Sequence, residues 1–391
     1  MDEESIFMIW FERRNLSKNS RIIYRRYIKQ YSEFTKKSVS QLYSEALADE
    51  KNNVYLLERE YYKDSLKFIK YLRENGKSIN TVNVAITSIN AFYKAFKIRS
   101  PEIETKKGDL TQEKNYGRAL TKKDIRRLVD VANAKQSAII YLMALSGFSQ
   151  AEMRNLKLRN FFDSVNNEVG YEFNNIKEII DHEHDIKELL LQVEITREKV
   201  HYRYTTFIPP ETVGRLLTYL RERYHTENDK MENLEAALIQ RRNGTYYNPT
   251  DIAKIFERLG KKAGFKQQEH GAYRFWRSHA LRHYFITTFI DDVGDYIVAN
   301  YLAGHRISDQ DRTYWRSNPQ KLRQKYLKAL PYLSIDEGKI LTFESEEYKK
   351  AKKKIKHLEK NQENLKPLAD AIQKNPRLLE IIAEELTKKE D

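Results

Sequence analysis

Apolar residues in the first hundred positions recur every three or four residues, the spacing that lines one face of an α-helix. Polar and charged residues fill the positions between them, so each helix would bury one side and expose the other. Residues 1–100 are therefore expected to form an all-helical domain. The apolar stripes predict one helix after Ser17 and Asn19 (Ile23, Tyr27, Tyr31, Phe34), one ending near Asn75-Gly76 (Tyr62, Leu66, Ile69, Leu72), and one from Ile79 to Phe96 (Val82, Ile86, Ile89, Tyr93).

The pattern changes after this domain. Residues 101–118 have few apolar positions and little periodicity, which indicates a flexible linker. Thr121 and Asp124 then stand at capping-box spacing and would begin a helix. The apolar run at 138–148 predicts a buried helix that follows closely.

A strand-like stretch interrupts the helical pattern of this second part. Residues 189–195 and 202–207 predict two antiparallel strands, with Lys199 near the turn between them. The expected fold class is mostly α with a small antiparallel β-sheet: an N-terminal helical domain followed by a second domain at 119–340. Further helices are expected at 211–223, 249–259 and from Pro319 to near Pro331.

Residues 341–391 are expected to form a basic tail of helical character. Its apolar positions follow heptad spacing over a short distance only, so a short coiled coil, a helix docked on a neighbour and a single solvated helix all stay open. The positions in question are Tyr348, Ala351, Ile355, Leu358, Gln362 and Leu365.

The charge of the chain points to a polyanionic partner. The 391 residues carry a formal net charge of +14, and Lys and Arg gain affinity for phosphates by releasing counterions. Four cations on the helix after Ser17 would form a basic face suited to DNA: Arg21, Arg25, Arg26 and Lys29. With no cysteine, no leader and no long apolar run, we expect a soluble, cytoplasmic protein associated with the nucleoid.

One insert collects potential metal ligands. Residues 181–185 read Asp-His-Glu-His-Asp, residue types that bind zinc. Adjacent residues rarely point at one ion, so we expect an exposed loop of mixed charge rather than a metal site. No other cluster indicates a catalytic metal, and no Gly-rich phosphate-binding loop is present in the sequence.

The most informative segment runs from His279 to Tyr314. His279 and Arg282 lie one helical turn apart, a Gly304-His305 pair follows, and Tyr314 comes shortly after. A tyrosine hydroxyl with a pKa of about 10 is a poor nucleophile unless cations or a base assist it. Cationic donors around one tyrosine suit attack on a phosphodiester, because they neutralise the charge that builds on the phosphate.

This spacing resembles the tyrosine recombinase (phage integrase) family, most clearly in SHALRHYFITTF and LAGHRISDQDRTYW. The resemblance extends to both halves of the chain: a helical DNA-clamp domain, a linker, and a catalytic domain opening with ALTKKDIRRLV. The segment YWRSNPQKLRQKYLKALPYLSI is similar to archaeal branches of the family.

The resemblance implies a role for each matching residue. Tyr314 would be the nucleophile that forms a 3′-phosphotyrosyl link to DNA, and Arg282 would hold the scissile phosphate. His279 would assist proton transfer, His305 would hydrogen-bond the phosphate, and Lys199 would be the general acid on the hairpin. The covalent link conserves the energy of the phosphodiester, so neither a metal nor another cofactor is expected.

The chain departs from the family pattern at one position. The resemblance implies a first catalytic arginine just after the glycine in SGFSQAEMRNLKL, but Gly147 is followed by Phe148, Ser149 and Gln150. Gln150 can still donate a neutral hydrogen bond, and Arg154 would substitute only if the helix were turned or shifted. A degenerate copy, a weakened variant and a compensated active enzyme are the open alternatives.

The expected function is that of a site-specific DNA recombinase, the integrase of a mobile element. Its partners would be double-stranded DNA and three further copies of the chain, as a homo-tetramer on paired sites. Two alternatives stay open. One is a catalytically silent homologue that occupies or regulates a recombination site; the other is a type IB topoisomerase-like enzyme that needs no paired sites.

Overall fold

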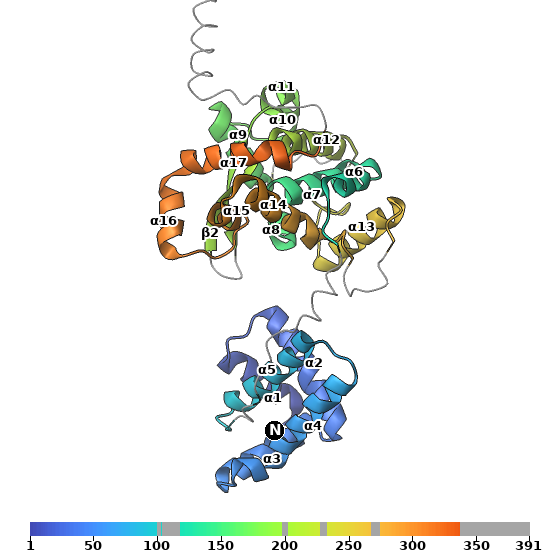
Figure 1. The fold of residues 1–391 in the computed structure, drawn as a ribbon, viewed down its shortest axis with the longest axis vertical. Helices are drawn as coiled ribbons and strands as arrows, with labels where there is room; N and C mark the ends of the chain where they lie inside the picture. The colour runs from blue at the N-terminus through green and yellow to red at the C-terminus, as the bar shows by residue number, and fades with distance from the viewer. Residues whose placement is uncertain (100–102, 104–117, 198–201, 227–232, 267–273, 337–391) are drawn as a thin grey trace, which may run out of the picture. The chain divides into compact units, whose positions relative to one another are not determined.

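The computed structural model describes the chain except for residues 100–102, 104–117, 198–201, 227–232, 267–273 and 337–391 (Figure 1). The predicted linker, apart from two of its residues, Lys199 and the predicted tail lie outside the described residues. The chain divides into two compact units. Unit 1 comprises Met1–Ala119 with Gln267–Phe275, and unit 2 comprises Leu120–Lys266 with Trp276–Asp391.

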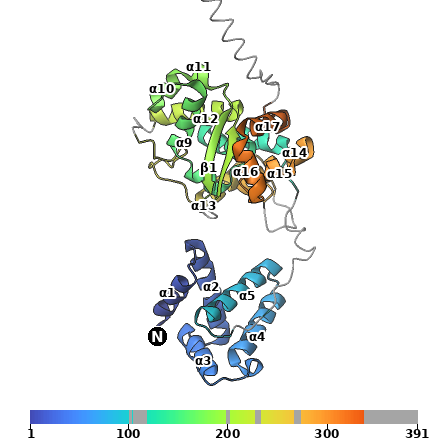
Figure 2. The ribbon, with the colours of Figure 1, turned by 90° about the vertical axis from the view of Figure 1, so that its left-hand side faces the viewer.

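Unit 1 is a helical bundle, as the apolar spacing predicts (Figure 2). Serine side chains cap several of its helices; Ser17 and Ser78, for example, each accept a hydrogen bond from a backbone N–H in the first turn. The helices are α1 (Glu3–Arg13), α2 (Lys18–Thr35), α3 (Val39–Lys51), α4 (Glu60–Glu74) and α5 (Ile79–Ala95), with a short 3₁₀ helix at Leu56–Glu58.

Aromatic rings fill the core of unit 1. Trp10 is fully buried and packs edge-on against Phe92, with 5.2 Å between the ring centroids. Tyr31 is also fully buried and contacts the ring of Phe68. The predicted burial is wrong for two residues of the apolar stripes, because Ile23 is 41% exposed and Leu66 is 44% exposed. With 3.6 residues per turn, these two positions lie outside the buried face of their helices. Other residues of α2 and α4 form that face.

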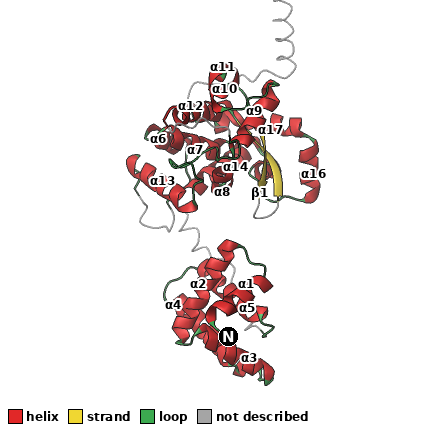
Figure 3. Ribbon diagram, turned by 180° about the vertical axis from the view of Figure 1, so that it is seen from behind, coloured by secondary structure: helices red, strands yellow, loops and turns green. Residues whose placement is uncertain are grey.

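Unit 2 is mostly helical and contains one two-stranded sheet among its described residues (Figure 3). This arrangement confirms the expected fold class. The elements are α6 (Lys122–Asp130), α7 (Ala134–Leu145), α8 (Gln150–Asn155), α9 (Leu158–Val169), α10 (Ile176–Asp181), α11 (Glu183–Ile186), β1 (Leu191–Arg197), β2 (Tyr202–Ile208), α12 (Pro210–Thr226), α13 (Pro249–Lys262), α14 (Ser278–Val293), α15 (Tyr296–Leu302), α16 (Asp309–Ser317) and α17 (Pro319–Leu333).

Helix α7 lies at the centre of unit 2 (Figure 1). Every residue from Ser137 to Leu145 is buried, which matches the prediction of a buried helix from the apolar run. Helices α12, α14 and α17 all pack against it. The helix is therefore covered on several sides, and the residues that follow it at 146–150 are held in a fixed place.

The hairpin is fixed to the end of this central helix. Strands β1 and β2 pair antiparallel, with Leu191 opposite Ile208 and Arg197 opposite Tyr202. The buried hydroxyl of Thr206 donates a hydrogen bond of 2.8 Å to the backbone oxygen of Ser146. This contact ties β2 to the turn that follows α7.

One expectation about local structure needs correction. Residues 181–185 are mostly exposed, as expected, but they are mostly helical rather than a loop, because Ile179 and Ile186 on α10 and α11 are buried and anchor the segment. Helix α17 ends at Leu333, close to the predicted end near Pro331, since a proline near the last turn removes only one backbone hydrogen bond.

The acidic residues of the insert are engaged in ion pairs. Asp181 pairs with Lys177, and Glu183 pairs with Arg221 on α12. Among the described residues, no group of three or more His, Asp or Glu side chains is placed to hold a metal ion. In the same part of the chain, every helix is too short or too polar to cross a bilayer.

Candidate active site

Helix α14 carries two of the predicted site residues in its first turns. Arg282 is 1% exposed and faces the interior beside Leu281 and Phe285, whereas His279 lies nearer the helix start and is exposed. Partial removal from water, together with the positive charges of Arg277 and Arg282, lowers the pKa of His279. His279 is therefore protonated less readily than a free histidine.

Arg282 is held by the turn that ends α7. Its Nη1 donates to the backbone oxygen of Gly147 at 2.7 Å and lies 3.2 Å from Oε2 of Glu152. The turn requires glycine, because φ of Gly147 is +69° and an added Cβ would lie 2.7 Å from the ring of Phe285. The second terminal nitrogen, Nη2, is buried and has no hydrogen-bond partner among the described residues.

A buried donor without an acceptor costs about 1–3 kcal/mol, so Nη2 of Arg282 needs an explanation. A bound anion would supply the acceptor. Burial lowers the pKa of Arg282, but guanidinium stays protonated in proteins. The side chain is thus a fixed cation with one donor free to meet an anionic oxygen.

Glu152 joins Arg282 to a second arginine. Its Oε2 also accepts from the backbone N–H of Ser149 at 2.7 Å, the return half of a capping box that starts α8. Its Oε1 lies 3.1 Å from Nε of Arg197, the last residue of β1. One carboxylate, only 4% exposed as a side chain, therefore positions two guanidinium groups.

His305 lies beside these arginines, after a second glycine turn. An added Cβ on Gly304, whose φ is +66°, would lie 2.5 Å from the ring of Tyr204 on β2. Nη1 of Arg197 donates to the backbone oxygen of Gly304 at 2.9 Å. Burial, together with the charges of Arg282 and Arg197, lowers the pKa of His305 to about 4.

Asn300 fixes the tautomer of His305. The amide nitrogen of Asn300 donates to the backbone oxygen of Tyr296 at 2.8 Å, which turns its Oδ1 toward the imidazole. Nδ1 of His305 lies 2.7 Å from that oxygen and so carries the proton. In the neutral ring Nε2 is then a proton acceptor, and protonation would make it a donor to phosphate.

Tyr314 lies on α16 and is 45% exposed. Its hydroxyl accepts a hydrogen bond from Nζ of Lys321 at 3.3 Å, and the same ammonium lies 5.5 Å from the ring centroid. Among the described residues, it makes no hydrogen bond to His279, Arg282 or His305. The structure thus brings the two histidines and the arginines of the site together, but not the tyrosine.

The sequence of the second unit decides the family. The sequence model of the Phage integrase family matches residues 118–321, which is more than half of the chain. The chain belongs to the phage integrase family. It is a tyrosine-type DNA recombinase, and this confirms the resemblance seen in the motif segment.

A relative agrees with this membership, and solved structures were compared for their fold. Tyrosine recombinase XerA of Pyrococcus furiosus is 23% identical over 277 residues, covering 68% of this chain and 80% of the relative. The Tn1549 transposon integrase in complex with transposon right end DNA shares the fold, with a TM-score of 0.50 and 15% identity over 82% of this chain and 98% of that one. A lambda integrase dimer bound to a COC′ core site gives a TM-score of 0.48 at 13% identity, covering 79% and 97%.

In this integrase-family chain, Gln150 and Arg154, the two residues considered as substitutes for the first arginine, make their hydrogen bonds outside the cluster around Arg282. Nε2 of Gln150 donates to the backbone oxygen of Pro249 at 2.8 Å. Nη1 of Arg154 donates to the backbone oxygen of Tyr247 at 3.0 Å. Both side chains therefore point toward the segment that starts α13, and neither contacts Arg282 or Glu152.

The sequence analysis missed Arg197 and Asn300 as parts of the site. Arg197 precedes Lys199 by two positions in ITREK, and this proximity was the available signal. Asn300 precedes His305 by five residues and gave no signal, because its role depends on the turn between them. Lys199 itself lies outside the described residues.

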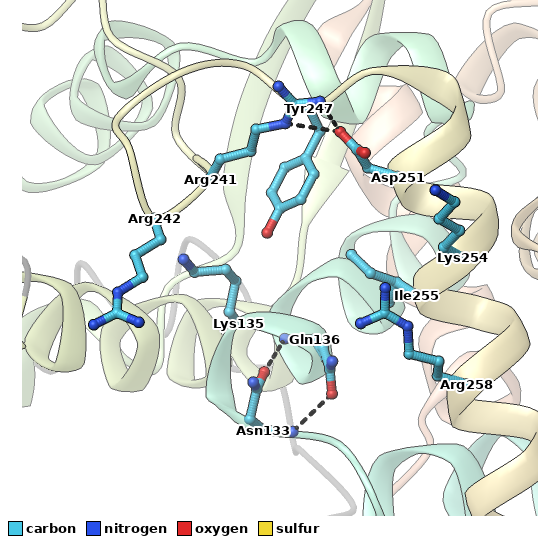
Figure 4. Close-up of a pocket in the computed structure, with 10 residues that line it drawn as sticks. All are labelled: Asn133, Lys135, Gln136, Arg241, Arg242, Tyr247, Asp251, Lys254, Ile255 and Arg258. Carbon is cyan, nitrogen blue, oxygen red and sulfur yellow. Dashed lines mark hydrogen bonds and ion pairs between the residues drawn. The ribbon is translucent and has the colours of Figure 1, made fainter.

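A basic cavity of about 320 Å³ lies between α7, α13 and the segment before α13 (Figure 4). Of the cations that line it, Arg241 is paired with Asp251. Four other cations contribute to the lining and make it positively charged. They are Lys135, Arg242, Lys254 and Arg258.

The basic face predicted on α2 is partly neutralised within unit 1. Arg25 pairs with Glu4, and Lys29 lies 3.2 Å from a carboxylate oxygen of Glu3. Arg21 donates to a backbone oxygen and stands over the ring of Phe11, and Arg26 stands over the ring of Tyr27. Contact between these four residues and DNA stays a prediction.

Proposed function

We propose that this recombinase cuts and rejoins duplex DNA through a covalent link to Tyr314, as the integrase of a mobile element. The observation that carries the proposal is the buried cationic cluster: Arg282, fixed by Gly147 and Glu152, keeps one donor without a partner among the described residues. Such a cluster is built before substrate arrives, and prearranged donors stabilise the charge of a phosphoryl transition state.

In the proposed reaction, the oxygen of Tyr314 attacks the phosphorus of one phosphodiester. The bond from phosphorus to the 5′ oxygen breaks, and that oxygen takes up a proton, which we assign to Lys199 as general acid. The phosphate stays attached to the tyrosine through its 3′ side. Rejoining reverses these steps: a 5′ hydroxyl attacks, and the phenol leaves, so no ATP, metal or other cofactor is needed.

The histidines serve the same phosphate in this proposal. A bound phosphate would offset the positive charge that lowers the pKa of His305, so the ring would take up a proton more readily. Its Nε2 would then donate to a phosphate oxygen, while Asn300 keeps the ring oriented. His279, whose pKa is lowered, would accept a proton near Arg282.

The phenol makes no hydrogen bond to this cluster among the described residues, so in this proposal it approaches the cluster when DNA binds. None of the residues of α16 is buried, so the helix is not anchored by a core of its own. Elements with few buried contacts move at low cost in free energy. We propose that α16 shifts when DNA binds and carries Tyr314 toward Arg282.

DNA would be held by both units. The cavity cations of unit 2 form a surface suited to the phosphate backbone, and the uncompensated cations of α2 would add to it. Recombination joins two sites, so we propose a homo-tetramer on paired sites, associated with the DNA of the nucleoid. Lambda integrase has been seen as a tetramer bound to a Holliday junction.

A nicked suicide duplex tests the proposal. The nick lets a short strand diffuse away after cleavage, so a covalent protein–DNA adduct accumulates. We expect an adduct with the wild-type chain and none with Tyr314→Phe, because only the hydroxyl is lost. The matched control is Tyr332→Phe, since Tyr332 is also exposed but lies on α17.

The outcomes separate the alternatives. Tight binding without an adduct would support a silent DNA-binding homologue, which the absence of an arginine at Ser149 and Gln150 favours. Adduct formation and relaxation of supercoiled DNA without any joining of two sites would indicate a topoisomerase-like enzyme. An equal yield of adduct with Tyr314→Phe would show that another group is the nucleophile.

A further inference from the structure

The end of strand β1 places a second guanidinium group in the site. Arg197 lies next to the hairpin turn, and its side chain is 29% exposed, whereas that of Arg282 is 2% exposed. Nε of Arg197 faces Oε1 of Glu152, and Nη1 donates to Gly304. Because the side chain is partly exposed, it is accessible to a ligand approaching from solvent.

Both arginines are aligned by the two oxygens of one carboxylate. Oε2 of Glu152 lies 3.2 Å from Arg282, and Oε1 lies 3.1 Å from Arg197. The charges of both arginines act on His305, which lies beside them. Two guanidinium groups held this way converge on one small region, and their charge exceeds that of Glu152 by one unit.

A phosphodiester presents two non-bridging oxygens, and each needs a cation as negative charge builds during attack. Arg282 can meet one of them. Ser149 and Gln150 carry no charge, and Arg154 directs Nη1 to the backbone oxygen of Tyr247, whereas Arg197 shares the carboxylate of Glu152 with Arg282.

We propose that Arg197 neutralises the second non-bridging oxygen and so replaces the arginine that the family motif places after Gly147. This inference rests on the proposed function, because it assigns a residue to the same reaction. It makes the chain a compensated enzyme. The turn between α7 and α8 lacks a cation, and Arg197 of the hairpin supplies one beside the carboxylate of Glu152.

A simpler role for Arg197 is purely structural: its bond to the backbone oxygen of Gly304 holds the turn that carries His305. The two roles differ in their dependence on phosphate charge. If a non-bridging oxygen is replaced by a methyl group, the phosphate is neutral and no longer needs the second cation. Loss of a turn-holding contact would harm both substrates alike.

The experiment measures the rate of covalent attachment on two suicide duplexes, one with a normal scissile phosphate and one with a methylphosphonate there. The variants are Arg197→Ala and Arg197→Gln; the glutamine keeps a donor for Gly304 but carries no charge. The matched control is Arg203→Ala, because Arg203 lies on the same hairpin, is exposed and pairs with Glu194. Duplex affinity and thermal unfolding are measured for each variant.

On the normal duplex we expect both Arg197 variants to attach about 10²–10³-fold more slowly than wild type, the usual loss for one transition-state donor. On the methylphosphonate duplex the difference should shrink to less than about tenfold, because the charge to be neutralised is gone. Arg203→Ala should match wild type on both.

Two results would overturn the inference: Arg197→Gln attaching at the wild-type rate, or a defect of equal size on both duplexes. If Arg197→Ala unfolds, Arg197→Gln carries the comparison. Failure of the proposed function looks different. The wild-type chain would then form no adduct that depends on Tyr314, whatever residue stands at position 197.

Discussion

At the scale of single residues, Glu152 sets the net charge of the site, because its one carboxylate pairs with both Arg282 and Arg197. A lone carboxylate next to two guanidinium groups cannot neutralise both, and Nη2 of Arg282 keeps no hydrogen-bond partner among the described residues. The sequence predicted Arg282, because it lies one turn from His279. It could not predict Arg197 in this role, since the contact with Gly304 spans 107 positions and depends on the hairpin folding back.

The low pKa of His305 predicts how stability depends on pH. The folded pKa of about 4 is below the unfolded value of about 6.5, so the unfolded chain binds the proton more readily. The contribution of neutral His305 to the free energy of unfolding is complete above about pH 6.5 and is lost as pH falls toward 4. We expect the unfolding free energy of the wild-type chain to decline over this window, and less so for His305→Gln.

Urea unfolding at pH 7 and pH 5 measures this difference. His225→Gln is the control, because His225 is exposed on α12. An NMR titration of the imidazole gives the pKa directly. A value near 6.5 for His305 in the free protein would contradict the expected effect of burial and of the charges of Arg282 and Arg197.

At the scale of elements, apolar periodicity predicted several helices whose positions are set by burial, but not α9, which also buries apolar residues. Helix α7 is the clearest case, since its whole middle is buried. Helices α10 and α11 escaped prediction because they are short and mostly charged, with few apolar anchors. Helix α16 has no buried residue at all, yet it carries Tyr314, so its place depends on partners rather than on a core.

The exposure of α16 predicts that it is mobile before DNA binds. The chain has no cysteine, so Gln310→Cys on α16 accepts a single spin label. We expect a narrow, mobile spectrum in free protein and a restricted one on the suicide duplex, because attack on the phosphate requires Tyr314 to be held in place. Asp291→Cys on α14 is the control. Equal mobility of the two labels in free protein would argue that α16 is already fixed.

At the scale of the whole molecule, charge is divided between the two units. Unit 1 pairs part of its basic face with the acidic first turn of α1, so that Arg25 and Lys29 add less net charge than their number implies. Unit 2 gathers cations around its cavity with Asp251 as one lining carboxylate. The formal net charge of +14 indicated a polyanionic partner but could not show which cations were already paired.

This division predicts the salt dependence of DNA binding. Each cation that contacts a phosphate adds about 0.9 to the slope of log affinity against log salt. Replacing both Lys254 and Arg258 of α13 by glutamine should therefore flatten the slope by about two, equally for specific and unrelated duplexes. The control replaces Lys67 and Lys70 on α4 by glutamine. This double variant loses the same charge, but both lysines already face carboxylates. Because net charge is equal in the two double variants, a difference between their slopes isolates contact with the phosphate backbone, and identical slopes would place the cavity cations away from DNA.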